Sequence, residues 1–148
     1  MIHLEVLTHD HLKRIQLRAD HADYVRALGK WDAGVAPALV RNGGIALVAP
    51  EGVVACAGVS MFWEGVGQLW MRTGELAEQY PHALAKRAKN FVRSTEECLR
   101  LKRLQAVVLV ENEVARRFIC WLGFQAEGLL RNYGPEGADY IMFAKVRG

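Results

Sequence analysis

The sequence predicts a single α/β domain over residues 1–148, in which a mixed, mostly antiparallel sheet is flanked by helices on both faces. Three observations carry this prediction. Short apolar runs are separated by turn signals rich in Gly and Pro, as in antiparallel strands. One long segment repeats its apolar residues at helical spacing. A second helical segment directly follows a buried strand.

The first part of the chain predicts one strand and two helices. Residues 2–6 have the composition of a short strand. Thr8 then has the character of a helix N-cap, because its hydroxyl can accept an amide of the first turn. Leu12 and Ile15 begin the apolar side of that helix, and a second helix is predicted over residues 22–28.

The middle of the chain predicts three consecutive antiparallel strands. Asn42-Gly43-Gly44 is a strong turn signal, and a further turn, Pro50-Glu51-Gly52, joins two Val- and Ala-rich runs into a hairpin. Glycines at 65 and 67 turn the chain once more. The predicted strands cover residues 45–49, 53–63 and 68–72.

The last part of the chain alternates helices and strands. Pro81 suits a first helical turn, where its missing N–H costs nothing, and Gly123 can end a helix in the left-handed conformation. The predicted elements are a helix over 81–103, a buried strand over 104–110, a helix over 113–122, and two strands flanking 134–137.

Composition limits the classes of function. The chain has 51% hydrophobic and 24% charged residues and a net charge of +3, as expected of an ordinary globular protein rather than of one with a large nucleic-acid footprint. It has no apolar run near the ~20 residues that span a bilayer, and its N-terminus lacks the pattern of a signal peptide. We therefore expect a cytoplasmic protein without a membrane partner.

Several reactive or aromatic residues have ordinary structural interpretations. Three cysteines lie far apart in apolar patterns, which predicts reduced core thiols rather than a disulfide or a metal site. His9 and His11 do not share a helix face, so no metal ligand set is predicted. Trp63 and Trp70 are expected to pack in the core or hairpin, with the lining of an acceptor groove as the alternative. The cysteines are Cys56, Cys98 and Cys120.

Residues 104–146 contain one distinctive spacing, N-x-x-A-x-x-F-x-x-x-L-G-F, followed by Glu-Gly and Arg. It is formed here by Asn112, Ala115, Phe118, Leu122-Gly123-Phe124, Glu127-Gly128 and Arg131. On these residues the segment resembles the GNAT superfamily of N-acetyltransferases. The resemblance implies a GNAT-like fold and acetyl-CoA as the coenzyme, with Asn112, Ala115 and Phe118 on the coenzyme side. The plainer interpretations are helix capping by Asn112 and core packing by Ala115, Phe118, Leu122 and Phe124. Val114 is expected on the same side of the helix as Ala115, Phe118 and Leu122.

Two parts of the family's pattern are missing. The family's phosphate loop reads Q/R-x-x-G-x-G/A, whereas residues 73–87 contain only Gly74, together with Pro81 and two glutamates, Glu75 and Glu78. Lys86 and Arg87 could compensate in part, so any acetyl-CoA site is expected to be weak. The tyrosine that often serves as the general acid is replaced by Ile119, and the neighbouring Cys120 is assigned to the core.

Candidates for the general base are weak. Glu64 lies in a predicted turn, Glu75 follows a predicted strand, and His82 begins a helix. Each also has a plain interpretation, as a solvated loop charge for the two glutamates and as an ordinary first-turn residue for His82.

The segment 44–146 also resembles the GNAT-like proteins encoded among bacteriophage virion genes, including internal virion proteins. The features that carry this likeness are Trp70, Thr73, Tyr80-Pro81, Asn112 and the basic residues Lys86, Arg87, Lys89 and Arg93. It implies a virion-associated or assembly role in the host cytoplasm, with phage structural proteins or further copies of the chain as partners. The alternatives are an active N-acetyltransferase acting on an unknown primary amine and, less favoured, a nucleic-acid-binding module that uses the basic helix.

Overall fold

The computed structural model describes residues 1–15 and 43–147. The helix predicted over 22–28 lies outside the described residues. Seven strands form one sheet in the order β1-β2-β3-β4-β5-β7-β6. The pairs β1–β2, β2–β3, β5–β7 and β6–β7 are antiparallel, and β4 pairs with β5 in parallel. The predicted class of fold, an α/β protein with a mixed and mostly antiparallel sheet, is confirmed.

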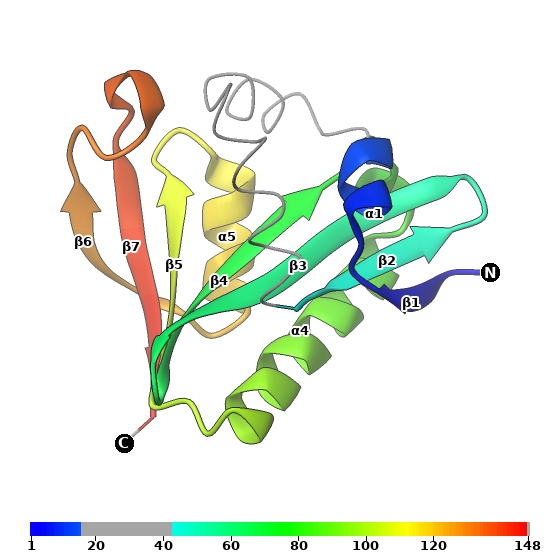
Figure 1. Ribbon diagram of the computed structural model, residues 1–148. Coiled ribbons are helices and arrows are strands. Elements are labelled where there is room, and N and C mark those ends of the chain that lie inside the picture. Colours follow the sequence, from blue (N-terminus) through cyan, green and yellow to red (C-terminus); the bar gives the residue numbers. More distant parts are fainter. Residues whose placement is uncertain (16–42, 148) are drawn as a thin grey trace. The chain divides into compact units, whose positions relative to one another are not determined.

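The described residues separate into two compact units. Unit 1 comprises those within Met1–Ser60 and Trp70–Ala88, and unit 2 those within Met61–Leu69 and Lys89–Gly148. In chain order the elements are β1 (His3–Val6), α1 (His9–Arg14), β2 (Ile45–Ala49), β3 (Gly52–Trp63), β4 (Val66–Thr73), the 3₁₀ helix η1 (Glu75–Gln79), α4 (Pro81–Cys98), β5 (Arg103–Leu109), α5 (Glu113–Trp121), β6 (Gln125–Leu130), η2 (Pro135–Gly137) and β7 (Tyr140–Val146), as Figure 1 shows.

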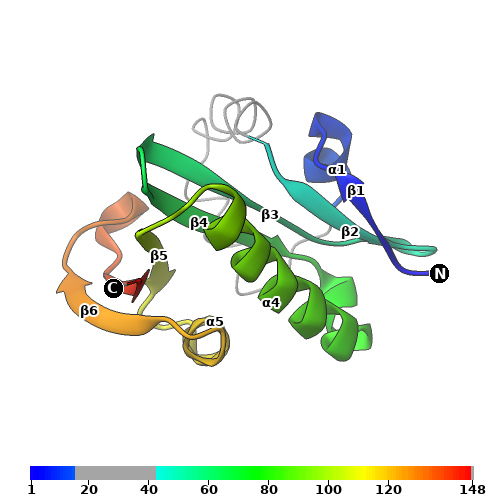
Figure 2. The ribbon, with the colours of Figure 1, turned by 90° about the horizontal axis from the view of Figure 1, so that it is seen from below.

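Unit 1 buries both faces of its strands. Along β2, Ala46 and Val48 belong to one hydrophobic cluster with Leu12 and Ile15, while Leu47 and Ala49 belong to another with η1 and Leu84 of α4. This is the two-residue alternation of a strand with both faces covered. Figure 2 shows α1 and the beginning of α4 on opposite sides of these strands.

A β-bulge in β3 shifts this alternation. Leu47 pairs with Ala55 and Val48 pairs with Val53, so Val54 is the extra residue. As a result, Val54 and Ala55 both join the cluster beneath α4. On the side of β3 that faces β4, the Val54 carbonyl accepts the N–H of Gly74 at 2.8 Å. The sequence gives no sign of this bulge.

The start of α1 confirms the predicted cap. The Thr8 hydroxyl accepts the N–H of His11, and the Thr8 N–H donates to His11 Nδ1 at 3.0 Å, which forms a capping box. The buried His11 ring also contacts Glu5, with Nε2 2.8 Å from Oε1. The described residues contain no group of three or more His, Cys, Asp or Glu side chains arranged to hold a metal ion.

In unit 2, β5 pairs with β7 along its whole length, and β7 pairs with β6. The helix α5 packs against β5 (Figure 1), and its buried Ile119 and Leu122 lie in the same unit as the buried Leu104 and Phe143 of the strands. None of the described helices has the length and apolar character required to cross a bilayer.

Both long helices end in the same kind of motif. After α5, Gly123 has φ +102°, and Phe124 N–H donates to the Ile119 carbonyl at 3.2 Å, as predicted for a glycine stop. After α4, Arg100 takes the equivalent place with φ +50°, and Leu101 N–H donates to the Glu96 carbonyl at 3.0 Å. The predicted helix over 81–103 is therefore too long at its C-terminal end, because an arginine rarely marks this stop.

Four predictions about burial are wrong. Cys98 and Cys120 are free thiols but exposed, so only Cys56 is a core thiol. Val114 is 56% exposed, because the buried side of α5 runs through Ile119 instead. Trp63 is 68% exposed, because β3 extends past the core before it turns.

Candidate coenzyme site

The beginning of α4 is where the family pattern places the phosphate loop. Here η1 fills that stretch, and Tyr80 connects it to Pro81 at the start of α4. The first bond of the helix runs from Leu84 N–H to the Tyr80 carbonyl at 3.0 Å. The backbone N–H groups of His82 and Ala83 precede that bond, and Pro81 has none, so the helix start offers two donors where a helix without proline would offer three.

The loop's single glycine is already engaged. The Gly74 N–H donates to Val54, and the Gly74 carbonyl accepts the N–H of Ala77 at 3.0 Å. Its φ of −92° and ψ of 174° are extended values that any residue can adopt. Gly74 therefore caps η1 and ties it to β3, and its amide is not free to bind an anion.

A carboxylate lies next to this helix start. The Tyr80 hydroxyl donates to Glu51 and lies 2.7 Å from both of its carboxylate oxygens. This hydrogen bond lowers the pKa of Glu51 and raises the pKa of Tyr80. At neutral pH the pair is thus a carboxylate and a neutral phenol, and the negative charge is held at the N-terminal end of α4.

The remaining predicted residues of unit 1 lie along the same stretch of chain. Glu75 is exposed in the first turn of η1, and His82 is exposed in the first turn of α4. Lys86 is exposed and Arg87 is half-buried in the second turn of α4. His82 and Lys86 are four residues apart and so share one face of the helix.

In unit 2, Asn112 holds the start of α5. Its side-chain oxygen accepts the N–H of Ala115 at 3.0 Å, and its carbonyl accepts the N–H of Arg116, also at 3.0 Å. The predicted N-cap is therefore confirmed. The oxygen is used by the helix, so the side-chain NH₂ is the group that Asn112 can offer to a ligand, since no acceptor contacts it among the described residues.

The other predicted coenzyme residues of α5 differ in exposure. Ala115 and Phe118 are half-buried, and the Phe118 ring stacks on Trp121 with centroids 6.0 Å apart. Ile119 is only 6% exposed. Its side chain belongs to the core of unit 2, where it supplies packing and no titratable group.

One edge of β5 is open within unit 2. The strand pairs with β7 from Arg103 to Leu109, but it pairs with β4 only over three residue pairs, from Val66 with Arg103 to Gln68 with Gln105. Among the described residues of unit 2, the second edge of 106–109 therefore has no strand partner. This edge leads directly to Asn112.

Glu64 lies at the other end of β5. Its neighbour Gly65 accepts the N–H groups of Lys102 and Arg103 at 2.7 and 3.0 Å, just where β5 begins. The six steps along β5 from Arg103 to Leu109, at ~3.3 Å each, then separate this turn from the end of the strand near Asn112 by about 20 Å. Unit 2 therefore does not bring Glu64 close to the start of α5.

Sequence reasoning missed two of these features. The Tyr80–Glu51 bond joins residues 29 positions apart, and no local pattern marks it. The bond from Gly74 to Val54 likewise joins residues 20 positions apart. The visible signs that this helix start differs from an open anion site were the missing glycines, Pro81 and the two glutamates within residues 73–87.

Comparison with solved structures defines the class of fold. The chain is similar to a protein provisionally named a phosphinothricin N-acetyltransferase (TM-score 0.75, 11% identity, 100% of this chain and 99% of that one). It is also similar to a ribosomal-protein-S5-alanine acetyltransferase from Vibrio fischeri (TM-score 0.67, 14% identity, 98% and 92%). A third is a GNAT-family acetyltransferase from Bacillus anthracis (TM-score 0.63, 15% identity, 76% and 71%).

The fold is thus that of the GNAT acetyltransferases. No protein-family model matches the sequence, and no curated protein does. At these identities the likeness concerns the fold and leaves activity to be argued from the residues.

Proposed function

We propose that this chain is a GNAT-fold, acetyltransferase-like protein that grips the diphosphate of acyl-CoA poorly and serves as a virion-associated or assembly protein of bacteriophage origin. The observation that carries the proposal is the start of α4. There the loop glycine is bonded to β3, the first helical residue is a proline, and Tyr80 holds the Glu51 carboxylate beside the helix.

A diphosphate at this helix start would lose hydrogen bonds that contribute to its affinity. A charge-assisted hydrogen bond contributes ~1.5–3 kcal/mol. The loss of two such bonds, from the N–H that Pro81 lacks and the engaged N–H of Gly74, would remove roughly 3–6 kcal/mol, or about two to four decades of affinity at ~1.4 kcal/mol per decade. Glu51 and Glu75 add repulsion for an anion, whereas Lys86 and Arg87 offset part of it. The residues present therefore fit the phosphate end of the coenzyme poorly.

The residue at the general-acid position also supports the proposal. A transferase of this kind needs a group that returns a proton to the departing thiolate. Ile119 stands where GNAT enzymes often have tyrosine, and it is buried in an apolar core. Changes at both the phosphate loop and the acid position are more easily explained by relaxed catalytic demand than by a single compensated substitution.

The phage and assembly parts of the proposal rest on the resemblance of residues 44–146 to GNAT-like virion proteins. They predict that the chain co-purifies with phage particles or assembly intermediates, with other structural proteins or further copies of itself as partners. Its absence from both, together with robust acetyl transfer, would overturn this part of the proposal.

A second candidate function is an active N-acetyltransferase for a primary amine. The observation in its favour is the open edge of β5 at 106–109, which leads to the Asn112 side chain. Backbone groups on such an edge can hold an extended, amide-containing arm. Glu75 and His82 of unit 1 and Glu64 of unit 2 are then the candidate bases.

Isothermal titration calorimetry with acetyl-CoA tests the proposal. We expect no saturable heat at micromolar ligand, and a Kd in the low micromolar range would contradict it. We also expect Glu51→Gln, which keeps the bond to Tyr80 but removes the charge, to strengthen any measurable binding. Glu97→Gln, another exposed glutamate but in unit 2, is the matched control and should change nothing.

A further inference from the structure

The helix α5 of unit 2 presents an apolar stripe to solvent. Val114 is 56% and Trp121 50% exposed, and Phe118 between them is half-buried. Their spacing of four and three residues places the three side chains on one side of the helix. The buried Ile119 and Leu122 instead face the core of unit 2. We name Val114, Phe118 and Trp121 the α5 stripe.

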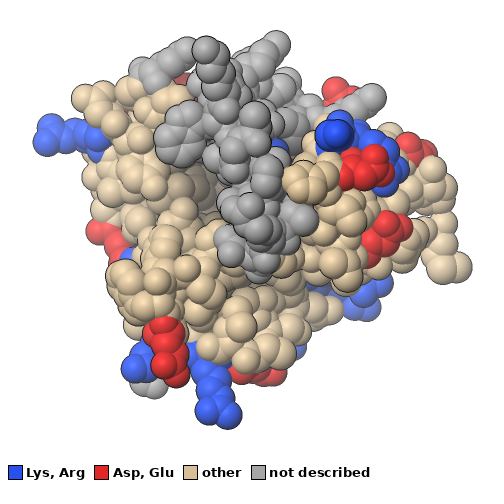
Figure 3. Space-filling model, viewed as in Figure 1, with Lys and Arg blue, Asp and Glu red and all other residues tan. Residues whose placement is uncertain are grey.

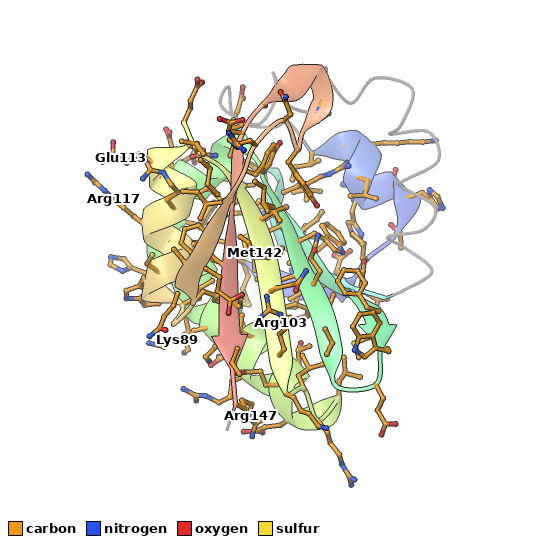
Figure 4. All side chains as sticks on the ribbon, turned by 90° about the vertical axis from the view of Figure 1, so that its left-hand side faces the viewer. Lys89, Arg103, Glu113, Arg117, Met142 and Arg147 are labelled. Atoms are coloured by element: carbon orange, nitrogen blue, oxygen red, sulfur yellow. The ribbon has the colours of Figure 1, made fainter. Side chains whose placement is uncertain are left out.

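The two ends of the α5 stripe carry opposite charges. Glu113 precedes Val114 at the N-terminal end and is exposed. At the other end Lys89 of α4 lies over the Trp121 ring, with Nζ 4.5 Å from its centroid. Eight residues at ~1.5 Å each separate Glu113 from Trp121, so the acid and the cation lie about 12 Å apart along the helix. Figure 4 shows Glu113 at the upper end of α5 and Lys89 near its lower end.

Both of these charged groups can take a further partner. Arg117 Nη2 donates to Oε1 of Glu113, and no cation contacts the other carboxylate oxygen among the described residues. Lys89 Nζ contacts the face of an indole, and no carboxylate contacts it within the described part of the chain. Each group can therefore form an ion pair with a second molecule and keep its present contact.

A second copy of the chain matches this pattern. When two such helices lie antiparallel about a two-fold axis beside Phe118, Val114 of each copy meets Trp121 of the other. The same arrangement brings Glu113 of each copy to Lys89 of the other, so two ion pairs form together. Packed helices lie about 8–10 Å apart, a spacing that side chains of this size fill.

We propose that the α5 stripe is a contact between two copies of the chain, which pair antiparallel through its three apolar side chains and are joined at each end by Glu113 and Lys89. This specifies one kind of partner named in the proposed function, further copies of the chain, and rests on that part of it alone. It does not depend on coenzyme binding or on association with phage particles.

The charge pattern favours a second copy over a different partner. A uniformly acidic or uniformly basic surface would meet a like charge at one end of the α5 stripe, whereas the two-fold arrangement matches both ends. Arg117, in the middle of the exposed side of α5, is already paired with Glu113 of its own copy. On the front face of the molecule, Lys, Arg, Asp and Glu side chains lie mainly at the margins (Figure 3), so its central part offers no such charged ends.

The small size of the contact sets the expected affinity. The helix α5 has nine residues, and one helix of this length covers less than the ~800 Å² per partner of a standard interface. We therefore expect a weak dimer, which forms at roughly 0.1–1 mM chain and dissociates at low micromolar concentrations.

Sedimentation velocity of the full chain between about 5 µM and about 1 mM tests the proposal. We expect a monomer at the lowest concentration and a dimer at the highest. Lys89→Glu and Glu113→Lys should each weaken association at least ten-fold, because each places like charges together at both ends of the contact. The controls Lys102→Glu and Glu97→Lys make the same changes of charge at exposed positions outside the α5 stripe, and should stay within two-fold of the unchanged chain.

A variant with both charges exchanged provides the sharpest test. Lys89→Glu/Glu113→Lys should associate at least three-fold more tightly than either single variant, because each end of the contact again meets its opposite. Within one chain these two residues lie too far apart along α5 to pair, so the recovery must come from a second copy. Val114→Ser/Trp121→Ser removes apolar surface and should weaken association at least ten-fold.

Two results would overturn the proposal: a chain that stays monomeric at the highest concentration, or a double charge exchange that associates no better than the single changes. If the unchanged chain dimerises and Val114→Ser/Trp121→Ser does so equally well, the contact lies elsewhere and the proposal is wrong. Circular dichroism should find all variants folded, since each substitution is at an exposed position. Calorimetry with acetyl-CoA is a separate measurement, so this proposal and the proposed loss of diphosphate binding can fail independently.

Discussion

The starts of α4 in unit 1 and α5 in unit 2 are built in opposite ways. At α5, Asn112 caps the helix with its side-chain oxygen, and the adjoining strand edge is open within unit 2. At α4, a proline occupies the first turn, the preceding glycine is bonded to β3, and the Glu51 carboxylate lies beside Tyr80. One helix start is capped by a side chain, and the other presents a proline and a nearby carboxylate.

The difference teaches that the two helix starts are held by different kinds of interaction. The start of α5 is stabilised from within the helix, because the Asn112 side-chain oxygen accepts the N–H of Ala115. The start of α4 is tied to neighbouring elements of unit 1, through the bond of Gly74 to β3 and the bond of Tyr80 to Glu51.

The largest expected effect concerns the acid position. Ile119→Ala should destabilise the chain by about 2–4 kcal/mol, because it leaves a cavity in the core of unit 2. Val114→Ala, on the exposed side of the same helix, should change the stability by less than about 0.5 kcal/mol. Urea denaturation measures both. Equal and small effects would mean that Ile119 is not a core residue and would reopen its interpretation as a site residue.

A smaller effect is expected at the cap of α5. Asn112→Ala should lower the free energy of unfolding by about 1 kcal/mol, because the Ala115 N–H loses its partner. Asn112→Asp keeps an accepting oxygen and should restore most of the loss. If alanine and aspartate behave alike in urea denaturation, the oxygen does not hold the helix start and the contrast with α4 fails.

The C-terminal ends of the two helices provide a still smaller test. Arg100 stands in the left-handed conformation where α5 has Gly123, and a side chain there carries a cost that glycine avoids. Arg100→Gly should therefore raise the free energy of unfolding by about 0.5 kcal/mol, after the entropic cost of glycine is subtracted. Arg93→Gly, within α4, should lower the free energy of unfolding. If both variants lose stability equally, Arg100 does not mark the end of the helix.

The pH dependence of the Tyr80–Glu51 pair should be the smallest effect. The pKa of Glu51 is lowered from its ordinary 4.5 and that of Tyr80 is raised from its ordinary 10.0. The pair's contribution is thus present between about pH 4.5 and pH 10, is lost as the pH falls through the lowered value, and is lost as it rises through the raised one. The Tyr80→Phe variant should have a lower free energy of unfolding than the unchanged chain between these pH values. The difference should shrink at lower and at higher pH, and urea denaturation across the pH range measures it.

Local chemistry made much of the fold predictable. The hydroxyl of Thr8, the amide of Asn112 and the missing side chain of Gly123 each mark a helix end through contacts within a few residues. The order of strands and helices along the chain followed from turn signals and from the change of period between strands and helices. The match to GNAT structures confirms the fold that these local signals predicted.

Features that depend on distant contacts were not predictable. The bulge at Val54 arises from the pairing of β2 with β3, and the bond of Gly74 to Val54 joins residues 20 positions apart. The helix stop at Arg100 uses a residue that seldom adopts positive φ. Exposure of Trp63 and Cys98 reflects where the core ends, which residue type alone does not specify.

The central proposal is that the diphosphate-bearing nucleotide of coenzyme A adds little to the affinity of this chain. The most direct measurement compares coenzyme A with pantetheine, which lacks that group, by titration of the amide NMR signals of 106–109 and Asn112. The account predicts that both bind weakly and within about ten-fold of each other. Coenzyme A binding a thousand-fold or more tightly than pantetheine, with shifts at His82 and Ala83, would contradict it.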